Sequence, residues 1–117
     1  MTEFGSTEWF DRLVVRAAGV ATSIDPPVVL EQVIANAPDG SMHRWHFVIG
    51  SGVRVVAGAA AEPTITFRCE WPTAVALARG TTNAQRAISA GQLHIGGDLE
   101  SLVTVAPLLA ELVVATS

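Results

Sequence analysis

The chain has 117 residues, of which half are hydrophobic and 15% are charged, and its formal net charge is −4 at pH 7. This length suits one compact domain over residues 1–117, and the apolar composition is far from that of a disordered chain. With no basic block and no lysine, the sequence argues against a nucleic-acid partner, a Schiff-base lysine and a phosphate-binding loop lysine.

The first predicted element is a helix that runs from about Ser6 or Thr7 to Gly19. Its apolar residues recur at helical spacing, and Glu8 and Arg12 stand four residues apart as an ion pair. Ser6 or Thr7 can cap the first backbone amides. Gly19 can take the left-handed turn that ends many helices.

A two-residue alternation of apolar and polar side chains follows and predicts β-strands. Turn residues separate the strands at short intervals, which is typical of an antiparallel meander. In the clearest strand, Trp45, Phe47 and Ile49 share one face. Five strands are predicted: Val28–Ile34, Arg44–Ile49, Val53–Gly58, a strand after Pro63 that contains Ile65, Phe67 and Cys69, and Gln92–Gly96.

Two short helices are predicted before the fifth strand. The first is Thr73–Arg79, with Pro72 suited to its first turn and Gly80 to its end. The second opens with Thr82 and Gln85 at the spacing of a capping box and ends at Gly91. Its inward residues are predicted to be Ala84, Ala87 and Ile88.

The last predicted element is a long helix capped by Asp98. Pro107 lies inside it, on the polar edge with Thr104 and Glu111, so we expect a bend or a break there and a helix that wraps around what it covers. The apolar surface of this helix is wider than one sheet contact requires. It is formed by Leu99, Leu102, Val103, Val105, Ala106, Leu109, Leu112 and Val113.

The stretch PTITFRCEWPTAVALARGTTNAQRAISAGQLHIGGDLESL, residues 63–102, resembles the sterol carrier protein type two family. The family's Thr-rich strand, short helix ending in Gly, and second short helix match Thr64–Phe67, Leu77–Gly80 and Asn83–Ala87. Its Gly-x-Leu-x-Ile-x-Gly-Asp motif matches Gly91–Asp98. Upstream, HRWHFVIGSGVRVVAG resembles the family's paired strands, so the likeness covers about Val28–Val113.

This resemblance implies an α+β fold in which helices pack on one face of a twisted, mainly antiparallel, five-stranded sheet. It also implies an apolar tunnel that binds sterols, fatty acyl chains or similar lipids, with no catalytic residue and no cofactor. From periodicity alone, the apolar side chains could equally form an ordinary packed core or line a ligand cavity. The resemblance favours the cavity. The residues expected to line it are Phe47, Phe67, Leu77, Ile88, Leu93, Leu102, Val105 and Leu109.

Two alternatives stay open. A small α+β isomerase or cyclase would need an acid or base facing its pocket, and Glu31, His46 and His94 are the candidates. An oligomerising accessory module of an enzyme would instead dock its C-terminal apolar stripe on another subunit.

A metal site is not expected, because the odd spacing of His43 and His46 sends the two side chains to opposite faces of a strand. Cys69 is the only cysteine, and on the apolar face of its strand it should behave as a small hydrophobe. Residues 1–6 show no secretory pattern, and the chain ends without a Ser-Lys-Leu signal. We expect a cytoplasmic monomer or weak homodimer that contacts membranes transiently.

Overall fold

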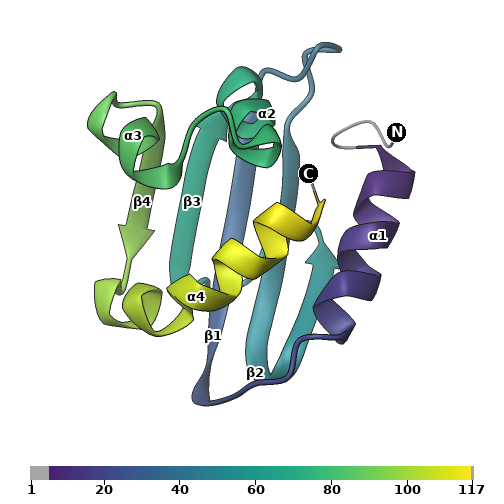
Figure 1. The fold of residues 1–117 in the computed structure, drawn as a ribbon, viewed down its shortest axis with the longest axis vertical. Helices are drawn as coiled ribbons and strands as arrows, with labels where there is room; N and C mark the ends of the chain where they lie inside the picture. Colours follow the sequence, from purple (N-terminus) through teal and green to yellow (C-terminus); the bar gives the residue numbers. More distant parts are fainter. Residues whose placement is uncertain (1–5, 117) are drawn as a thin grey trace.

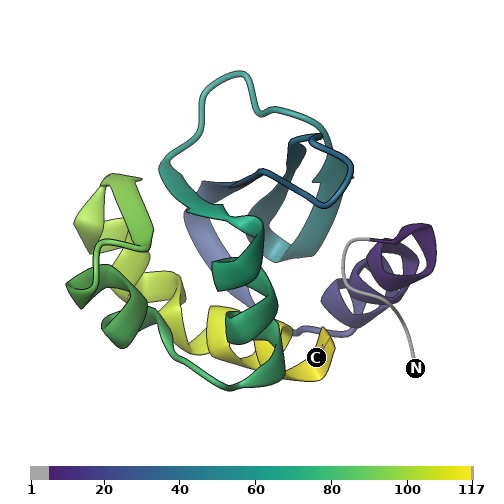
Figure 2. The same cartoon turned by 90° about the horizontal axis from the view of Figure 1, so that it is seen from above.

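The computed structural model describes residues 6–116, with side chains described up to residue 108. The helices cover one face of the sheet (Figure 1), and the connection that follows β2 rises on the opposite side (Figure 2). The elements in chain order are α1 (Thr7–Ala18), β1 (Ser23–Ala35), β2 (His43–Ala57), β3 (Ile65–Glu70), α2 (Trp71–Arg79), α3 (Ala84–Ser89), β4 (Leu93–Gly97) and α4 (Leu99–Thr116).

The strand order in the sheet is β2-β1-β3-β4. β2 turns back on itself near Ser51, and the amide of Gly58 donates to the carbonyl of Arg44 (2.9 Å). Counting both limbs of β2, the sheet has the five predicted strands. β1 is antiparallel to β2 but parallel to β3, so the meander predicted through this region is wrong at one pair. The connection over residues 58–64 crosses from the β2 edge of the sheet to the far side of β1 before β3 begins. For this reason β3 runs in the same direction as β1.

Alternation along the strands defines two faces of the sheet. We call the helix-covered face, which carries Leu30, Phe47 and Ile65, the inner face, and the other the outer face. On the inner face β2 presents apolar side chains to α1, whose Trp9 and Leu13 are 5% and 2% exposed. This contact forms most of the buried core.

Helix α1 begins where the sequence predicts, because the Ser6 Oγ accepts a hydrogen bond from the Trp9 amide (3.1 Å). The predicted Glu8–Arg12 ion pair is present at 3.1 Å. Gly19 ends the helix with φ −86°, so the predicted left-handed turn is wrong. The chain leaves the helix directly through a right-handed turn.

The short helices differ in detail from the prediction. α2 starts two residues earlier than predicted and ends, as predicted, at a left-handed Gly80 (φ 75°). α3 is capped by Asn83, whose side chain accepts from the Arg86 amide (2.9 Å), rather than by Thr82. Ala87 is fully buried, but the prediction that Ala84 and Ile88 point inward is wrong, because both are exposed. A helix of six residues makes fewer than two turns, so little more than one of its side chains can be buried.

The Asp98 side chain caps α4, accepting hydrogen bonds from the Glu100 amide (3.2 Å) and the Ser101 hydroxyl (2.8 Å). We expected a bend or a break at Pro107; the helix continues through it without a break, and Pro107 faces solvent as expected. Among its described side chains α4 buries a narrower stripe than predicted. Val105 is fully buried, whereas Leu99 and Val103 are 63% and 75% exposed. No described helix has the length and hydropathy needed to span a bilayer.

Candidate functional site

The predicted ligand residues divide by exposure. Three are buried, namely Phe47 in β2, Leu93 in β4 and Val105 in α4. Three are half-buried, namely Phe67 in β3, Leu77 in α2 and Leu102 in α4. Ile88 in α3 is 46% exposed and does not join them. The side chain of Leu109 lies outside the described residues.

Strand register brings several of these side chains onto one surface. Phe67 pairs with Ile95 of β4, Cys69 pairs with Leu93, and all four face inward. α4 contacts β3, α2 and α1, so it lies across this part of the inner face (Figure 1). The inner faces of β3 and β4, together with α2 and α4, therefore enclose a mostly apolar region.

Phe67 is less buried than its place in the sheet would predict. It lies on an interior strand, flanked by β1 and β4, and on the face that the helices cover. A large apolar side chain in that position is normally fully buried. Here Phe67 is only half-buried, and so are Ile95 and Leu102 around it.

One polar residue interrupts the inner face of β1. Val28, Leu30 and Ile34 are buried there, but Gln32 lies between them and is half-buried. Gln32 pairs with Trp45 of β2 on one side and with Phe67 of β3 on the other. A polar amide therefore lies at the centre of the sheet, on the side that faces the helices.

Trp45 is the second unusual polar group of the inner face. Its ring is 4% exposed and packs edge-on against Trp9, with ring centroids 5.4 Å apart and an interplanar angle of 61°. Phe10 makes a second edge contact at 6.4 Å. Within the described part of the chain, the buried Trp45 Nε1 has no hydrogen-bond acceptor. A buried donor left without a partner costs about 1–3 kcal/mol.

The structure places Cys69 on the inner face, half-buried among apolar neighbours. Burial raises the pKa of the Cys69 thiol to about 11. At neutral pH the sulfur is therefore a thiol rather than a nucleophilic thiolate. This agrees with the prediction that Cys69 behaves as a small hydrophobe.

The two closely spaced histidines lie on opposite faces, as their spacing predicts. His43 is on the inner face, where its ring centroid is 5.2 Å from that of Trp71. His46 is on the outer face, and its Nδ1 donates to the carbonyl of Gly58 (2.9 Å). They do not converge on a common point.

The three candidate acid–base residues also lie on the outer face. Glu31 pairs with His46, and His94 pairs with Arg68. Glu31 is 8% exposed beneath the connection after β2, where its Oε1 accepts a hydrogen bond from the Ala60 amide (2.8 Å). None of these three candidates faces the apolar region.

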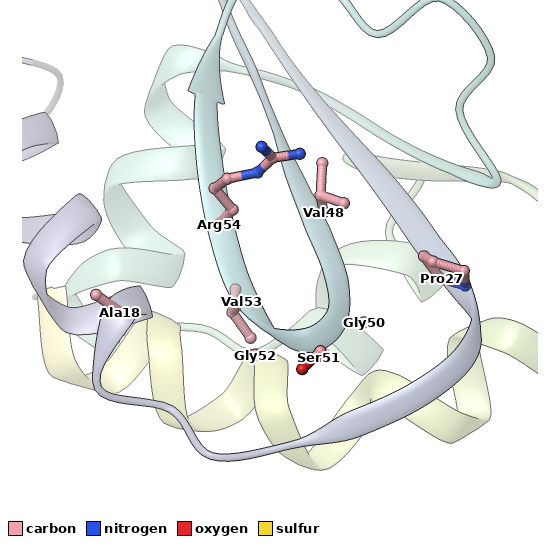
Figure 3. Close-up of a pocket in the computed structure, with 8 residues that line it drawn as sticks. All are labelled: Ala18, Pro27, Val48, Gly50, Ser51, Gly52, Val53 and Arg54. Carbon is pink, nitrogen blue, oxygen red and sulfur yellow. The ribbon is translucent and has the colours of Figure 1, made fainter.

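Two surface hollows lie away from the apolar region. One, of about 500 Å³, is at the β2 turn, where Arg54 and Val48 lie on facing limbs and Pro27 of β1 closes one side (Figure 3). The other, of about 600 Å³, is lined by side chains of α3 and its cap. None of the predicted ligand residues lines either hollow, and we assign neither to the site.

Sequence reasoning did not single out Gln32 or Trp45. A signal for Gln32 was present, because it stands at a core position in the alternation of Val28, Leu30 and Ile34. The importance of Trp45 could not be read from the alternation, since an apolar ring at an inward position is ordinary core. Only the missing hydrogen-bond partner distinguishes it.

These features define an α+β protein whose helices and five-stranded mixed sheet enclose a largely apolar interior with one polar spot. The model of the SCP-2 sterol transfer family matches residues 29–110, and the chain belongs to that family. The resemblance seen in the sequence, and the fold that it implied, are thereby confirmed. No curated protein sequence matches the chain.

Solved structures show the same fold at low sequence identity. The chain is similar to the crystal structure of Sterol Carrier Protein 2 Like 2 from Aedes aegypti (19% identity, TM-score 0.69, 86% of this chain and 92% of that one). It is also similar to the solution structure of the palmitated form from the same organism (20% identity, TM-score 0.67, 91% of this chain and 91% of that one). A third similar structure is that of apo Sterol Carrier Protein 2 from Yarrowia lipolytica (17% identity, TM-score 0.68, 95% of this chain and 94% of that one).

Proposed function

We propose that the protein is a non-catalytic carrier that binds one apolar molecule, a sterol, a fatty acyl chain or a similar lipid, between the inner face of the sheet and helix α4. The observation that carries the proposal is the partial exposure of Phe67 on the helix-covered face of an interior strand. An apolar surface that a helix covers but that is still partly accessible is suited to an apolar ligand.

Membership of a sterol transfer family supports this proposal. So does the palmitated state of the Aedes aegypti relative, a protein with the same fold. The outer-face positions of Glu31, His46 and His94 support the non-catalytic part. We therefore propose neither a cofactor nor a catalytic residue.

The proposed ligand-binding residues come from five elements. They are Phe47, Phe67, Leu77, Leu93, Leu102, Val105 and Leu109. We leave Ile88 out because of its exposure. In this arrangement α4 is the roof, and the chain acts as one lipid-binding unit.

The binding energy should be modest. Each buried methylene contributes roughly 0.8 kcal/mol, so ten of them contribute about 8 kcal/mol before the association cost is subtracted. That cost amounts to several kcal/mol, which leaves micromolar or weaker affinity. Fast release follows, as a carrier that collects lipid from membranes and delivers it in the cytoplasm requires.

Diphenylhexatriene, a fluorescent hydrocarbon, tests the proposal directly. The wild-type protein should take it up saturably at one molecule per chain. Leu102→Glu places a charge at the half-buried face of α4 and should weaken uptake at least tenfold, because burying an unpaired carboxylate is costly. Val103→Glu is the matched control, since that neighbouring residue is 75% exposed, and it should bind like wild type.

Thermal unfolding of both variants separates a binding defect from a folding defect. The proposal requires that Leu102→Glu stay folded at the assay temperature while its uptake falls. If wild type takes up no probe, or if both variants bind as well as wild type, the carrier function is wrong.

A further inference from the structure

We propose that Gln32 and Trp45 bind the polar head of the ligand, and that this head is an uncharged oxygen group such as a hydroxyl or a carbonyl. The inference rests on the carrier function proposed above and specifies its ligand further. A purely hydrocarbon ligand would leave the Trp45 donor unsatisfied.

The strand register places the two residues side by side. Gln32 and Trp45 are direct cross-strand partners on the inner face, so their Cβ atoms lie about 4.5–5.5 Å apart. Gln32 is on an interior strand, yet it is half-buried rather than buried. Its partial exposure on the helix-covered side means that open space reaches this part of the sheet.

Phe67 supplies the adjoining apolar surface. It is the partner of Gln32 on the other side, in β3, and it too is half-buried. A ligand with its head at the Gln32–Trp45 pair can therefore extend its tail over Phe67 toward β4. The two partly exposed residues, Gln32 and Phe67, are therefore neighbours on one face.

The chemistry of the pair selects an oxygen head. The indole N–H of Trp45 only donates, whereas the amide of Gln32 both donates and accepts. A hydroxyl can accept from Trp45 and donate to the Gln32 carbonyl, and a carbonyl oxygen can accept from both residues. Either head would provide an acceptor for Trp45 Nε1, which has none among the described residues. Because that nitrogen is fully buried, the indole must turn toward Gln32 for the head to reach it.

Charge on the two faces argues against an ionised head. The arginines of the described strands alternate with inward-facing neighbours and so lie on the outer face: Arg44, Arg54 and Arg68. The arginines of the described helices are exposed. The imidazole of His43, on the same face two residues before Trp45, already contacts the Trp71 ring and the Ser41 hydroxyl. A carboxylate at the Gln32–Trp45 pair would therefore be removed from water without a guanidinium to compensate it, which is unfavourable.

The test compares three fluorescent probes of related shape. Diphenylhexatriene has no hydrogen-bond acceptor, cis-parinaric acid has a carboxylate, and the alcohol obtained by reducing that acid has a hydroxyl on the same tail. The variants are Trp45→Phe, which removes the N–H, and Gln32→Leu, which removes the amide. Gln92→Leu, at an exposed glutamine before β4, is the matched control.

We expect both variants to weaken binding of the alcohol about threefold to tenfold, the loss of one hydrogen bond, and to leave diphenylhexatriene within twofold of wild type. The control should change neither. The wild-type protein should bind the alcohol more tightly than the ionised acid at pH 8.

Indole proton NMR provides a readout of ligand binding in the wild-type protein itself. The Trp45 N–H resonance, assigned by its loss in Trp45→Phe, should move downfield with the alcohol and much less with diphenylhexatriene. The resonances of Trp9 and Trp71 serve as internal references.

The outcomes separate the two proposals. If wild type binds no probe, the carrier function is wrong and the head site fails with it. If wild type binds diphenylhexatriene but the variants affect both probes equally, or neither, only the head site is wrong. Equal or tighter binding of the ionised acid would overturn the claim that the head is uncharged.

Discussion

Gly97 joins β4 to α4, and replacing it with alanine should destabilise the protein strongly. Its φ is +100°, a region that side-chain-bearing residues rarely adopt, and a Cβ there would lie 2.2 Å from the carbonyl oxygen of Thr64. That oxygen is already held, because it accepts a hydrogen bond from the Asp98 amide (3.0 Å). Backbone strain costs about 1–3 kcal/mol, and loss of the hydrogen bond adds about 1 kcal/mol.

The expected total for Gly97→Ala is therefore about 3 kcal/mol, a fall in melting temperature of roughly 10 °C for a domain of this size. Urea unfolding followed by circular dichroism measures it. Gly96→Ala is the control, since no atom lies within 4 Å of the Cβ it would add, and it should change stability by less than about 1 kcal/mol. Equal effects of the two substitutions would refute the reasoning.

Three further predictions concern single contacts. Ser6→Ala removes the α1 cap and should lower stability by about 1 kcal/mol in the same unfolding assay; no change would mean that the cap is not formed in solution. Glu31→Ala leaves the Ala60 amide without its acceptor and should cost about 1–3 kcal/mol, with Glu31→Gln costing less because it keeps an acceptor oxygen; equal losses would contradict this role. Burial raises the pKa of the Cys69 thiol from 9.0 to about 11, so the reactive thiolate forms only as pH rises toward that value. Iodoacetamide should alkylate the native protein at pH 8 about a hundredfold more slowly than the unfolded chain, and the native rate should rise about tenfold per pH unit up to pH 10; a rate that is flat over this range would be inconsistent with the raised pKa.

Local chemistry made much of the fold predictable. The alternation around Trp45 and Phe47 identified the inner face, and the caps at Ser6 and Asp98 marked the starts of the first and last helices correctly. The parallel β1–β3 pair was not predictable in this way. It depends on where the connection after β2 crosses the sheet, and turn residues do not encode that path.

The site was less predictable than the fold. Periodicity correctly placed Val105 in the interior, but it also placed Ile88 there, because a short helix has too few turns for its apolar spacing to define a buried face. The Gln32–Trp45 pair required the register between β1 and β2. A one-residue shift would have sent Gln32 to the opposite face.

Native mass spectrometry of the freshly purified protein tests the central claim most directly. The account predicts a population that carries one apolar small molecule per chain, released on denaturation and identifiable as a lipid with a single oxygen head. A spectrum of bare protein alone, together with no saturable uptake of the alcohol or hydrocarbon probe, would contradict an accessible interior between the sheet and α4.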